Sequence, residues 1–343
     1  MPHDQLQHFL YRLVRREDLT RDEAGQLLDA LLDAAATDSQ IAGALVALAS
    51  KGETVEELTG MALGLRGRAV SVKSDHACFI DTAGTGSSRA KTFNISTAAA
   101  FVIAGAGLPV AKHGNRAASS KSGSADVLSA LGVNVSALPK VSENSLKEIG
   151  ICFMFAPLYH GATARVAAIR RQLGVHTTFN LLGPLSNPAG APRQIIGVWR
   201  RDLVEHLAAV LACLGSERAW VVHGSDGLDE ITLTGKTFVA EAREGQVTTF
   251  EIEPSEFGLA SGTLDHLRGG DTEANAHIVR DVLMGVRRDE ARALVIMTAA
   301  SALVVGDVAK DLRSAASLAE QSIDSGAAAT KLEQLVRATN GQE

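Results

Sequence analysis

The chain has 343 residues, of which 46% are hydrophobic and 21% are charged, so its apolar content and length suit a globular enzyme of two domains. Its net charge of −6 argues against a general nucleic-acid-binding protein, which usually has a basic surface. Cys78, Cys152 and Cys213 match no metal-binding or redox spacing, which indicates buried structural thiols in a reducing cytoplasm.

The first 70 or so residues predict a run of helices. Thr20 with Glu23 forms a capping-box pattern, and Thr54 with Glu57 repeats it ahead of a second apolar segment. No residue pattern in this region indicates chemistry. A small helical domain with an apolar face left over could form a dimerisation surface, or it could pack against the rest of its own chain.

After Gly67 the pattern changes to strands that alternate with helices. Buried strands are predicted in "HACFIDTAG" (76–84), "LPVAKHG" (108–114) and "RAWVVHG" (218–224), each entering a loop. The alternation predicts an α/β domain from about residue 75 to the end of the chain. The longest apolar stretch, about 98–111, is too short to cross a bilayer, so we expect a soluble protein without membrane contact.

The stretch "DTAGTGSSRAKTFNIST" (81–97) lies between a predicted strand and a predicted helix. Its glycines allow a tight turn with free N–H groups, and the helix that follows adds its positive end, a combination typical of anion binding. It is not a dinucleotide fingerprint, because Arg89 replaces the third glycine, and Thr85 and Ala90 exclude a Walker A loop. Anion binding and an ordinary strand-to-helix turn both remain open for this stretch alone.

A second donor-rich loop follows the next strand. "AKHGNRAASSKSGSADVL" (111–128) combines Lys112, His113, Asn115 and Arg116 with several serine hydroxyls around Lys121. If the two strands are parallel neighbours, both loops converge at the carboxyl end of the sheet, where ligands bind in such folds. A solvated surface lysine is the alternative for Lys121 alone.

Two further segments carry charges in irregular or helical backbone. "VVHGSDGLDEIT" (221–232) places Asp226, Asp229 and Glu230 in a loop, where adjacent carboxylates can hold Mg²⁺ against a phosphate or can simply be solvated. In residues 156–190, Arg170 and Arg171 lie on a predicted helix. One of them could bind a substrate carboxylate, and a solvated helix face is the alternative.

These motifs, together with "FAPLYH", "RRQLGVHTTFNLLGPLSNPA" and "GGDTEANAHIV", closely resemble the anthranilate phosphoribosyltransferase family, in the family's order, over about residues 78–280. The resemblance implies a small N-terminal helical domain and a larger α/β domain with a central, mostly parallel sheet, as in nucleoside phosphorylases. It implies domains of residues 1–72 and 73–343, with helices from about 162–185 joining the smaller one, and a homodimer formed through that smaller domain.

The resemblance also implies an activity. The family transfers phosphoribose from 5-phosphoribosyl 1-diphosphate to anthranilate and releases diphosphate, in tryptophan biosynthesis, with Mg²⁺ as the required cofactor. The expected partners are these two substrates and a second copy of the chain, in the cytoplasm, without nucleic acid or membrane.

Carried over position by position, the resemblance implies three groups of site residues. The phosphoribosyl diphosphate contacts would be Gly84, Thr85, Gly86, Ser87, Ser88, Arg89, Lys91, Thr92, Asn94, Ser96, Thr97, Lys112, Ser119, Ser120 and Ser124. The anthranilate contacts would be His113, Asn115, His160, Arg170 and Pro184, with Arg170 facing the carboxylate. The magnesium ligands would be Ser96, Asp229 and Glu230. No side chain is implied as a catalyst in itself, because charge stabilisation and orientation suffice.

The sequence departs from the family pattern in the diphosphate loop. The family usually reads G-T-G-G-D-G, whereas the last three positions here are Ser87, Ser88 and Arg89, a shift of two charge units toward positive. The change could strengthen diphosphate binding, partly replace a metal, or block the pocket. His176, Thr163 and Thr298 also stand where other residues are expected.

Three interpretations therefore stay open. The chain could be an authentic anthranilate phosphoribosyltransferase, a paralogue that transfers phosphoribose to another aromatic amine or acid, or a non-catalytic binding relative. The intact Asp229–Glu230 pair, Lys112 and Asn115 favour a catalyst.

Overall fold

The computed structural model describes residues 4–86, 92–117 and 122–341. The chain begins with a bundle of α1 (Asp4–Val14), α2 (Arg21–Leu32), α3 (Asp38–Lys51) and α4 (Val55–Arg68), as predicted. Both predicted capping boxes are present, at Thr20 and Thr54, and a third begins α3 at Thr37. In each of them the threonine hydroxyl and the third helical side chain satisfy backbone N–H groups that the first turn leaves free.

The remainder of the chain is built on a seven-stranded sheet. Its strands are β1 (Ile80–Gly84), β2 (Val110–Gly114), β3 (Ile151–Phe155), β4 (Arg193–Gly197), β5 (Arg218–Gly224), β6 (Thr237–Arg243) and β7 (Gln246–Ile252), in the order β3-β2-β1-β4-β5-β6-β7. Strands β1 to β5 are parallel, and β6 and β7 are antiparallel additions. The mostly parallel sheet that the family resemblance implies is thereby confirmed.

The chain order of the strands reverses between β1 and β4. From β1 the chain moves outward to β2 and β3, and then it returns to place β4 on the other side of β1. The loops after β1 and β4 therefore leave in opposite directions. In open α/β sheets, ligands bind in the crevice at such a switch point, beyond the carboxyl ends of the strands.

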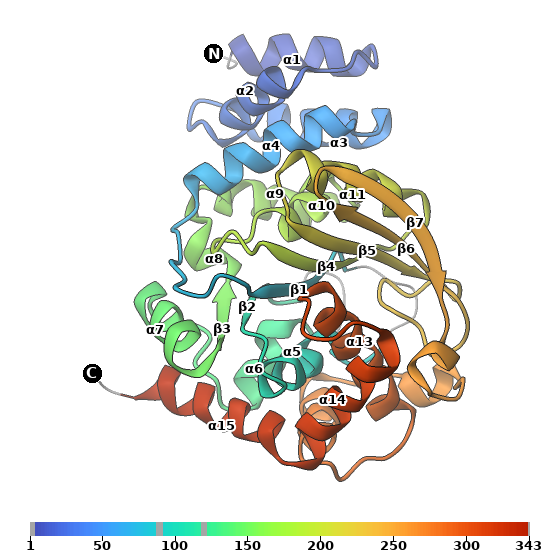
Figure 1. The fold of residues 1–343 in the computed structure, drawn as a ribbon. Coiled ribbons are helices and arrows are strands. Elements are labelled where there is room, and N and C mark those ends of the chain that lie inside the picture. The colour runs from blue at the N-terminus through green and yellow to red at the C-terminus, as the bar shows by residue number, and fades with distance from the viewer. Residues whose placement is uncertain (1–3, 87–91, 118–121, 342–343) are drawn as a thin grey trace.

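Helices cover both faces of the sheet (Figure 1). One face carries α5 (Ile95–Gly105), α6 (Ser124–Ala130), α12 (Thr272–Leu283), α13 (Glu290–Val305), α14 (Leu312–Asp324) and α15 (Ala327–Asn340), and α7 (Pro139–Ile149) lies beside β3. The other face carries α9 (Ala164–Leu173), α10 (Thr178–Leu185) and α11 (Asp202–Cys213), which also contact the N-terminal bundle. Neighbouring strand residues alternate between these layers, so Ile195 packs in one core and Ile196 in the other.

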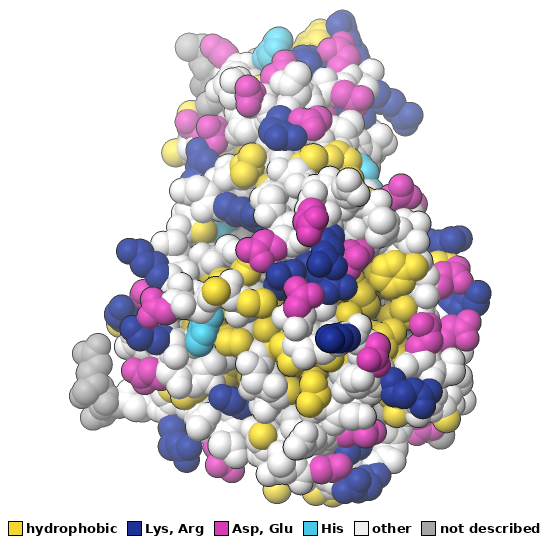
Figure 2. Space-filling model, viewed as in Figure 1, with side chains coloured by type: hydrophobic (Ala, Val, Ile, Leu, Met, Phe, Trp, Pro, Cys, Tyr) yellow, Lys and Arg dark blue, Asp and Glu magenta, His cyan; other side chains and the backbone are white. Residues whose placement is uncertain are grey.

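Small residues bring the helices close to one another. A side-chain carbon at Gly105, at the end of α5, would lie only 2.3 Å from the hydroxyl of Ser322 on α14. The alanine-rich and glycine-rich composition is thus used in close helix packing. Within the described part of the chain, no helix is long and apolar enough to cross a membrane. On the face drawn in Figure 2, basic and acidic side chains are interspersed.

Candidate functional site

The two donor-rich loops meet at the carboxyl ends of β1 and β2, as their parallel pairing requires. The Nδ2 of Asn94, just before α5, donates to the carbonyl oxygen of Ser122 at 3.4 Å. Asn275 on α12 donates to Asn94 Oδ1 at 3.2 Å and accepts from the Gly270 N–H at 2.8 Å. The predicted convergence of the loops is confirmed, and a third segment, Gly270–Asn275, joins them. This segment belongs to the "GGDTEANAHIV" motif, for which the sequence alone indicated no role.

The first loop leaves β1 through a small turn against β4. Thr85 donates both its N–H and its hydroxyl to the Gly197 carbonyl oxygen, at 2.9 and 3.1 Å. Gly86 has a φ of +68°, which favours glycine, and the backbone of Thr92 then pairs with Arg268. The predicted contacts Ser87, Ser88, Arg89 and Lys91 in this loop, and Ser119 and Ser120 in the second, lie outside the described residues.

Lys112 on β2 lies between the two loops and is only 4% exposed. Its ammonium donates to the carbonyl oxygen of Thr82, to the Thr82 hydroxyl at 3.4 Å and to the Ser96 hydroxyl at 3.3 Å. Burial lowers the pKa of Lys112, and the carboxylates of Asp81 and Glu230 oppose that shift. Lys112 is thus a buried positive charge in the site. It lies next to the first turn of α5, whose residues are predicted to contact phosphate.

The acidic loop after β5 presses against β4 and β1. A side-chain carbon at Gly197 would lie 1.8 Å from the Asp229 carbonyl oxygen, and one at Gly84 would lie 3.8 Å from it. Glycine at 197 is therefore what allows the Asp229–Glu230 backbone to reach the strand ends. Asp226 is not available as a ligand in the same way, because its carboxylate accepts hydrogen bonds from the hydroxyls of Thr232 and Thr234. These bonds stabilise the conformation of the loop.

The electrostatics of Glu230 follow from this placement. Burial, with the Asp229 carboxylate beside it, raises the pKa of Glu230 to about 8, and Lys112 and hydrogen bonds from Ser96 act in the opposite direction. Among the described residues, no three His, Cys, Asp or Glu side chains gather as in a complete metal centre. Two carboxylates and a hydroxyl form the partial oxygen set that suits Mg²⁺, which commonly completes its shell with water and substrate phosphate.

On the other side of Lys112, two histidines form a buried pair. The rings of His113 and His160 are 5.2 Å apart, and the Nε2 atom of each is buried without a hydrogen-bond partner in the described residues. His113 forms a hydrogen bond with the Gly183 backbone, and His160 with that of Ser186. Burial lowers the pKa of both rings, that of His113 to about 3, so both are neutral at physiological pH. The pair can offer neutral hydrogen-bonding groups to a small ligand.

Arg170, predicted to face a carboxylate, extends from α9 to the first turn of α10. Its Nη2 donates to Asn180 Oδ1 at 2.9 Å, and its guanidinium lies 5.6 Å from the centre of the Phe179 ring. Pro184 is buried inside α10, and its carbonyl oxygen accepts from Gln194 Nε2 at 3.0 Å. Four of the five predicted anthranilate contacts are thus gathered around α10.

The fifth, Asn115, is exposed and belongs to the second loop. Its carbonyl oxygen accepts the Ser124 hydroxyl at 3.3 Å, while Thr97 is buried in the first turn of α5. Of the three unusual positions, Thr163 donates to the His160 carbonyl oxygen at 2.8 Å, and His176 stacks near Trp199 with ring centres 4.6 Å apart. Thr298 donates to Leu294 within α13, at 3.0 Å.

The sequence reasoning missed a buried pair below the site. Asp81 on β1 is completely buried and accepts from Asn187 Nδ2 at 2.7 Å and from the His113 N–H at 3.1 Å. Asn187 also donates to the Ala111 carbonyl oxygen at 2.9 Å. Burial raises the pKa of Asp81 to about 6, against the charge of Lys112. A carboxylate in an otherwise apolar strand is the signal that could have revealed it.

A helical bundle joined to an α/β domain, with donor-rich loops facing an acidic pair, defines a two-domain glycosyl transferase. Residues 7–69 match the family model "Glycosyl transferase family, helical bundle domain", and residues 76–329 match "Glycosyl transferase family, a/b domain". The chain belongs to the anthranilate phosphoribosyltransferase family, as the following similarities show.

Curated relatives match almost the whole chain. The chain is 50% identical to the anthranilate phosphoribosyltransferase of Moorella thermoacetica, over 95% of this chain and 96% of that protein. It is 52% identical to that of Anaeromyxobacter sp. strain K, over 97% and 98%. The crystal structure of the Thermus thermophilus enzyme is similar with a TM-score of 0.92 at 37% identity, covering 97% of this chain and 99% of that one. The Saccharomyces cerevisiae enzyme in complex with PRPP and Mg gives 0.90 at 26% identity, covering 99% of each chain.

The buried histidines predict how stability depends on pH. In the unfolded chain His113 takes up a proton near its ordinary pKa of 6.5, whereas in the folded protein its pKa is about 3. The buried neutral ring of His113 therefore costs no stability above pH 6.5. As the pH falls below 6.5, the unfolding free energy decreases by up to about 1.4 kcal/mol per pH unit, because only the unfolded chain takes up the proton. We expect His113→Gln to reduce the slope of the unfolding free energy between pH 6 and pH 4.5, measured by urea denaturation. Equal slopes for both proteins would contradict the neutral, buried state of the ring.

Proposed function

We propose that the protein transfers phosphoribose from 5-phosphoribosyl 1-diphosphate to anthranilate and releases diphosphate, a step of tryptophan biosynthesis. The observation that carries the proposal is the meeting of three features at the β1–β4 crevice: two donor-rich loops, the Asp229–Glu230 loop and the buried His113–His160 pair. The relatives at about half identity, which carry this activity in their names, support the same reaction.

The phosphoribosyl diphosphate would occupy the side of the crevice formed by β1, α5 and α6. The turn Gly84–Gly86 and the start of α5 would present backbone N–H groups to phosphate, with Asn94, Ser96 and Thr97. Lys112 adds a buried positive charge behind them. The remaining contacts proposed for this substrate are Ser87, Ser88, Arg89, Lys91, Thr92, Ser119, Ser120 and Ser124.

Ser96, Asp229 and Glu230 would hold Mg²⁺, which would neutralise charge on the departing diphosphate. The structure of the yeast relative in complex with PRPP and Mg supports the use of Mg²⁺ with this substrate. The oxygen-only donor set of the three side chains fits the ion, and Lys112 lies close enough to Ser96 to counter charge on the same group, at 3.3 Å.

Anthranilate would bind between the histidine pair and α10. Neutral His113 and His160 would hydrogen bond the aromatic amine without charging it, and Arg170 would attract the carboxylate. The bond from ribose C1 to diphosphate breaks, the bond from C1 to the amine nitrogen forms, and the amine loses one proton. An aromatic amine is already a nucleophile, so orientation is the main contribution of these side chains.

An activity assay tests the function. The protein is mixed with 5-phosphoribosyl 1-diphosphate, Mg²⁺ and anthranilate, and the loss of anthranilate fluorescence and the release of diphosphate are followed. We expect both signals, in equal amounts. Diphosphate release only with another aromatic amine or acid would overturn the choice of acceptor, and no release with any acceptor would overturn the transfer reaction.

The unusual diphosphate loop gives a separate prediction. If Arg89 compensates for the family carboxylate missing at Ser88, Arg89→Ala should raise KM for 5-phosphoribosyl 1-diphosphate by about tenfold, the worth of one charge-assisted hydrogen bond to phosphate. The KM for anthranilate should stay nearly unchanged. Steady-state kinetics with each substrate varied in turn measures both, and an unchanged KM for the diphosphate substrate would mean that Arg89 does not contact it.

We also propose a cytoplasmic homodimer. The three cysteines are free thiols, which suits a reducing compartment, although only Cys152 is buried as expected, and Cys213 is exposed. The helical unit, which we place at residues 1–72 with 162–185, would form the dimer interface, and 73–343 would form the substrate-binding domain. Exposed apolar side chains on three bundle helices support this: Tyr11, Val14, Val46 and Leu63. Sedimentation analysis would test it, and a monomer at micromolar concentration would contradict it.

A further inference from the structure

The acceptor side of the crevice is organised by one short helix, α10. Arg170 binds Asn180 in its first turn, His113 forms a hydrogen bond with the Gly183 backbone near its end, and Pro184 lies within it. His160 forms its backbone hydrogen bond with Ser186, the residue that ends the helix. The position of α10 therefore sets the distances among the groups proposed to hold anthranilate.

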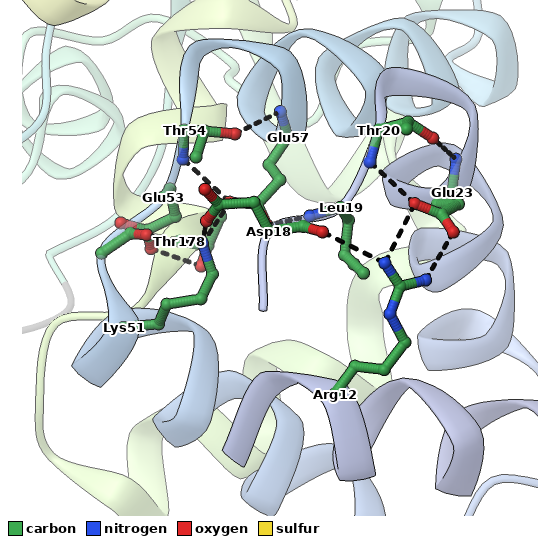
Figure 3. A network of polar contacts seen from close by, with 11 residues as sticks. Arg12, Asp18, Leu19, Thr20, Glu23, Lys51, Glu53, Thr54, Glu57 and Thr178 are labelled. Atoms are coloured by element: carbon green, nitrogen blue, oxygen red, sulfur yellow. Dashed lines mark hydrogen bonds and ion pairs between the residues drawn. The ribbon is translucent and has the colours of Figure 1, made fainter. Parts of the chain in front are cut away.

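Both ends of α10 are held by charged side chains of the N-terminal bundle. At the first residue, the Thr178 hydroxyl donates to Glu53 Oε1 at 2.5 Å (Figure 3). At the last residue, Arg66 Nε donates to the Leu185 carbonyl oxygen at 2.7 Å. The acidic group lies at the positive end of the helix and the basic group at the negative end, so both signs match the helix dipole. Thr178 is completely buried, which shields its contact from water.

Glu53 lies in the short segment between α3 and α4, and Glu57 binds the residues on both sides of it. Glu57 is completely buried, and its carboxylate accepts the N–H groups of Leu19 at 2.9 Å and of Thr54 at 2.8 Å. The same carboxylate accepts the ammonium of Lys51 at 2.9 Å, and Lys51 also binds Asp18 at 2.7 Å (Figure 3). The two residues on either side of the Gly52–Glu53 segment are thus anchored to one buried carboxylate. Glu53 is presented to α10 from a fixed position.

We infer that Glu53 and Arg66 are positioning residues for the acceptor substrate: they clamp α10 to the bundle and thereby set the geometry of Arg170, His113 and His160. Neither side chain belongs to the residues proposed to touch substrate. The inference rests on the proposed function, because it concerns anthranilate in that reaction. It predicts that changes in these bundle contacts alter the KM for anthranilate and leave the KM for 5-phosphoribosyl 1-diphosphate nearly unchanged.

Two substitutions test the two ends of the clamp. Thr178→Val removes the hydroxyl that Glu53 accepts and keeps the shape of the side chain, and Arg66→Met removes the guanidinium and keeps an unbranched stem. The matched control is Glu56→Gln, which breaks an ion pair with Arg21, at 3.0 Å, on the exposed side of the same bundle. All variants are assayed as full-length protein, with both substrates varied and the melting temperature recorded.

We expect Thr178→Val and Arg66→Met each to raise KM for anthranilate about three- to tenfold, part of the worth of one charge-assisted hydrogen bond. The KM for 5-phosphoribosyl 1-diphosphate should stay within about twofold, and Glu56→Gln should match the parent protein in both. Adding Glu53→Ala to Thr178→Val should cause no further rise, because the contact is already absent.

An unchanged anthranilate KM in both variants would overturn the inference, and so would a parallel rise of both KM values, which would indicate general loosening. If a variant melts at too low a temperature for kinetics, its affinity for anthranilate is measured below the melting temperature by anthranilate fluorescence. An affinity equal to that of the parent protein would then overturn the inference. The parent protein is assayed first: no turnover there would refute the proposed function, whereas normal turnover with unmoved KM values would refute only the clamp.

Discussion

Replacing Lys112 with methionine is expected to lower kcat/KM by on the order of 100-fold or more and the free energy of unfolding by about 3 kcal/mol. The ammonium is the buried positive charge between Asp81 and Glu230, and it donates to Thr82 and Ser96. Methionine fills a similar volume but leaves two carboxylates buried without it. Steady-state kinetics and urea denaturation at pH 7.5 measure the two losses.

A second variant separates the role of Lys112 in stability from its role in the reaction. Combining Lys112→Met with Asp81→Asn removes both charges of one buried pair, so we expect part of the stability to return while kcat/KM stays low. Lys140→Met, at an exposed lysine with a side-chain exposure of 69%, serves as the control and should change the unfolding free energy by no more than about 0.5 kcal/mol. A stable Lys112→Met protein with normal kcat/KM would contradict the assignment of Lys112 to the site.

Replacing Gly197 with alanine is expected to lower kcat/KM nearly as much as Lys112→Met does, because it displaces the acidic loop without changing any charge. The added carbon would lie 1.8 Å from the Asp229 carbonyl oxygen and 2.6 Å from its carbonyl carbon, so the acidic loop must move away from the strand ends. We expect kcat/KM to fall about 100-fold and the Mg²⁺ concentration for half-maximal activity to rise, with about 1–3 kcal/mol of stability lost to overpacking.

Gly67→Ala is the matched control for Gly197→Ala, because a side-chain carbon at Gly67 meets nothing within 4 Å. Its activity and Mg²⁺ dependence should equal those of the parent protein. If Gly197→Ala kept the parent Mg²⁺ dependence, the position of Asp229 and Glu230 at the strand ends would not matter for the ion, and their assignment as ligands would be wrong.

The local sequence predicted the parts of the site that lie at strand ends. Lys112 lies on a buried strand and the two donor-rich loops follow such strands. The carboxyl ends of parallel neighbours must meet, so the convergence of the loops needed no long-range information. The loop of Asp229 and Glu230 follows β5 and reaches the same strand ends. Asp226 lies in the same loop, but hydroxyls eight or fewer residues away occupy its carboxylate, and a list of acidic residues cannot show that difference.

Contacts between residues far apart in the chain could not be predicted from the local sequence pattern. Asp81 and Asn187 are 106 positions apart, and Glu53 and Thr178 are 125 positions apart, so neither pair leaves a periodic or spaced signature. The helices near 162–185 were linked to the bundle by family resemblance, since amphipathic periodicity shows that a helix has a partner without showing which one. Their packing is fixed by the tertiary fold.

The apolar core on the bundle side has a consequence for building hybrid proteins. One continuous cluster runs from Leu6 and Leu27 in the bundle through Ile169 and Leu182 to Leu207 on α11, and it ends on the sheet. No polar seam divides the described part of the first 70 residues from the elements below them. A chimera that exchanged α1–α4 between relatives at that boundary would cut through shared packing. Moving α9, α10 and α11 together with α1–α4 would shift the cut without removing it, because α11 packs against β5, β6 and β7 within the same apolar cluster.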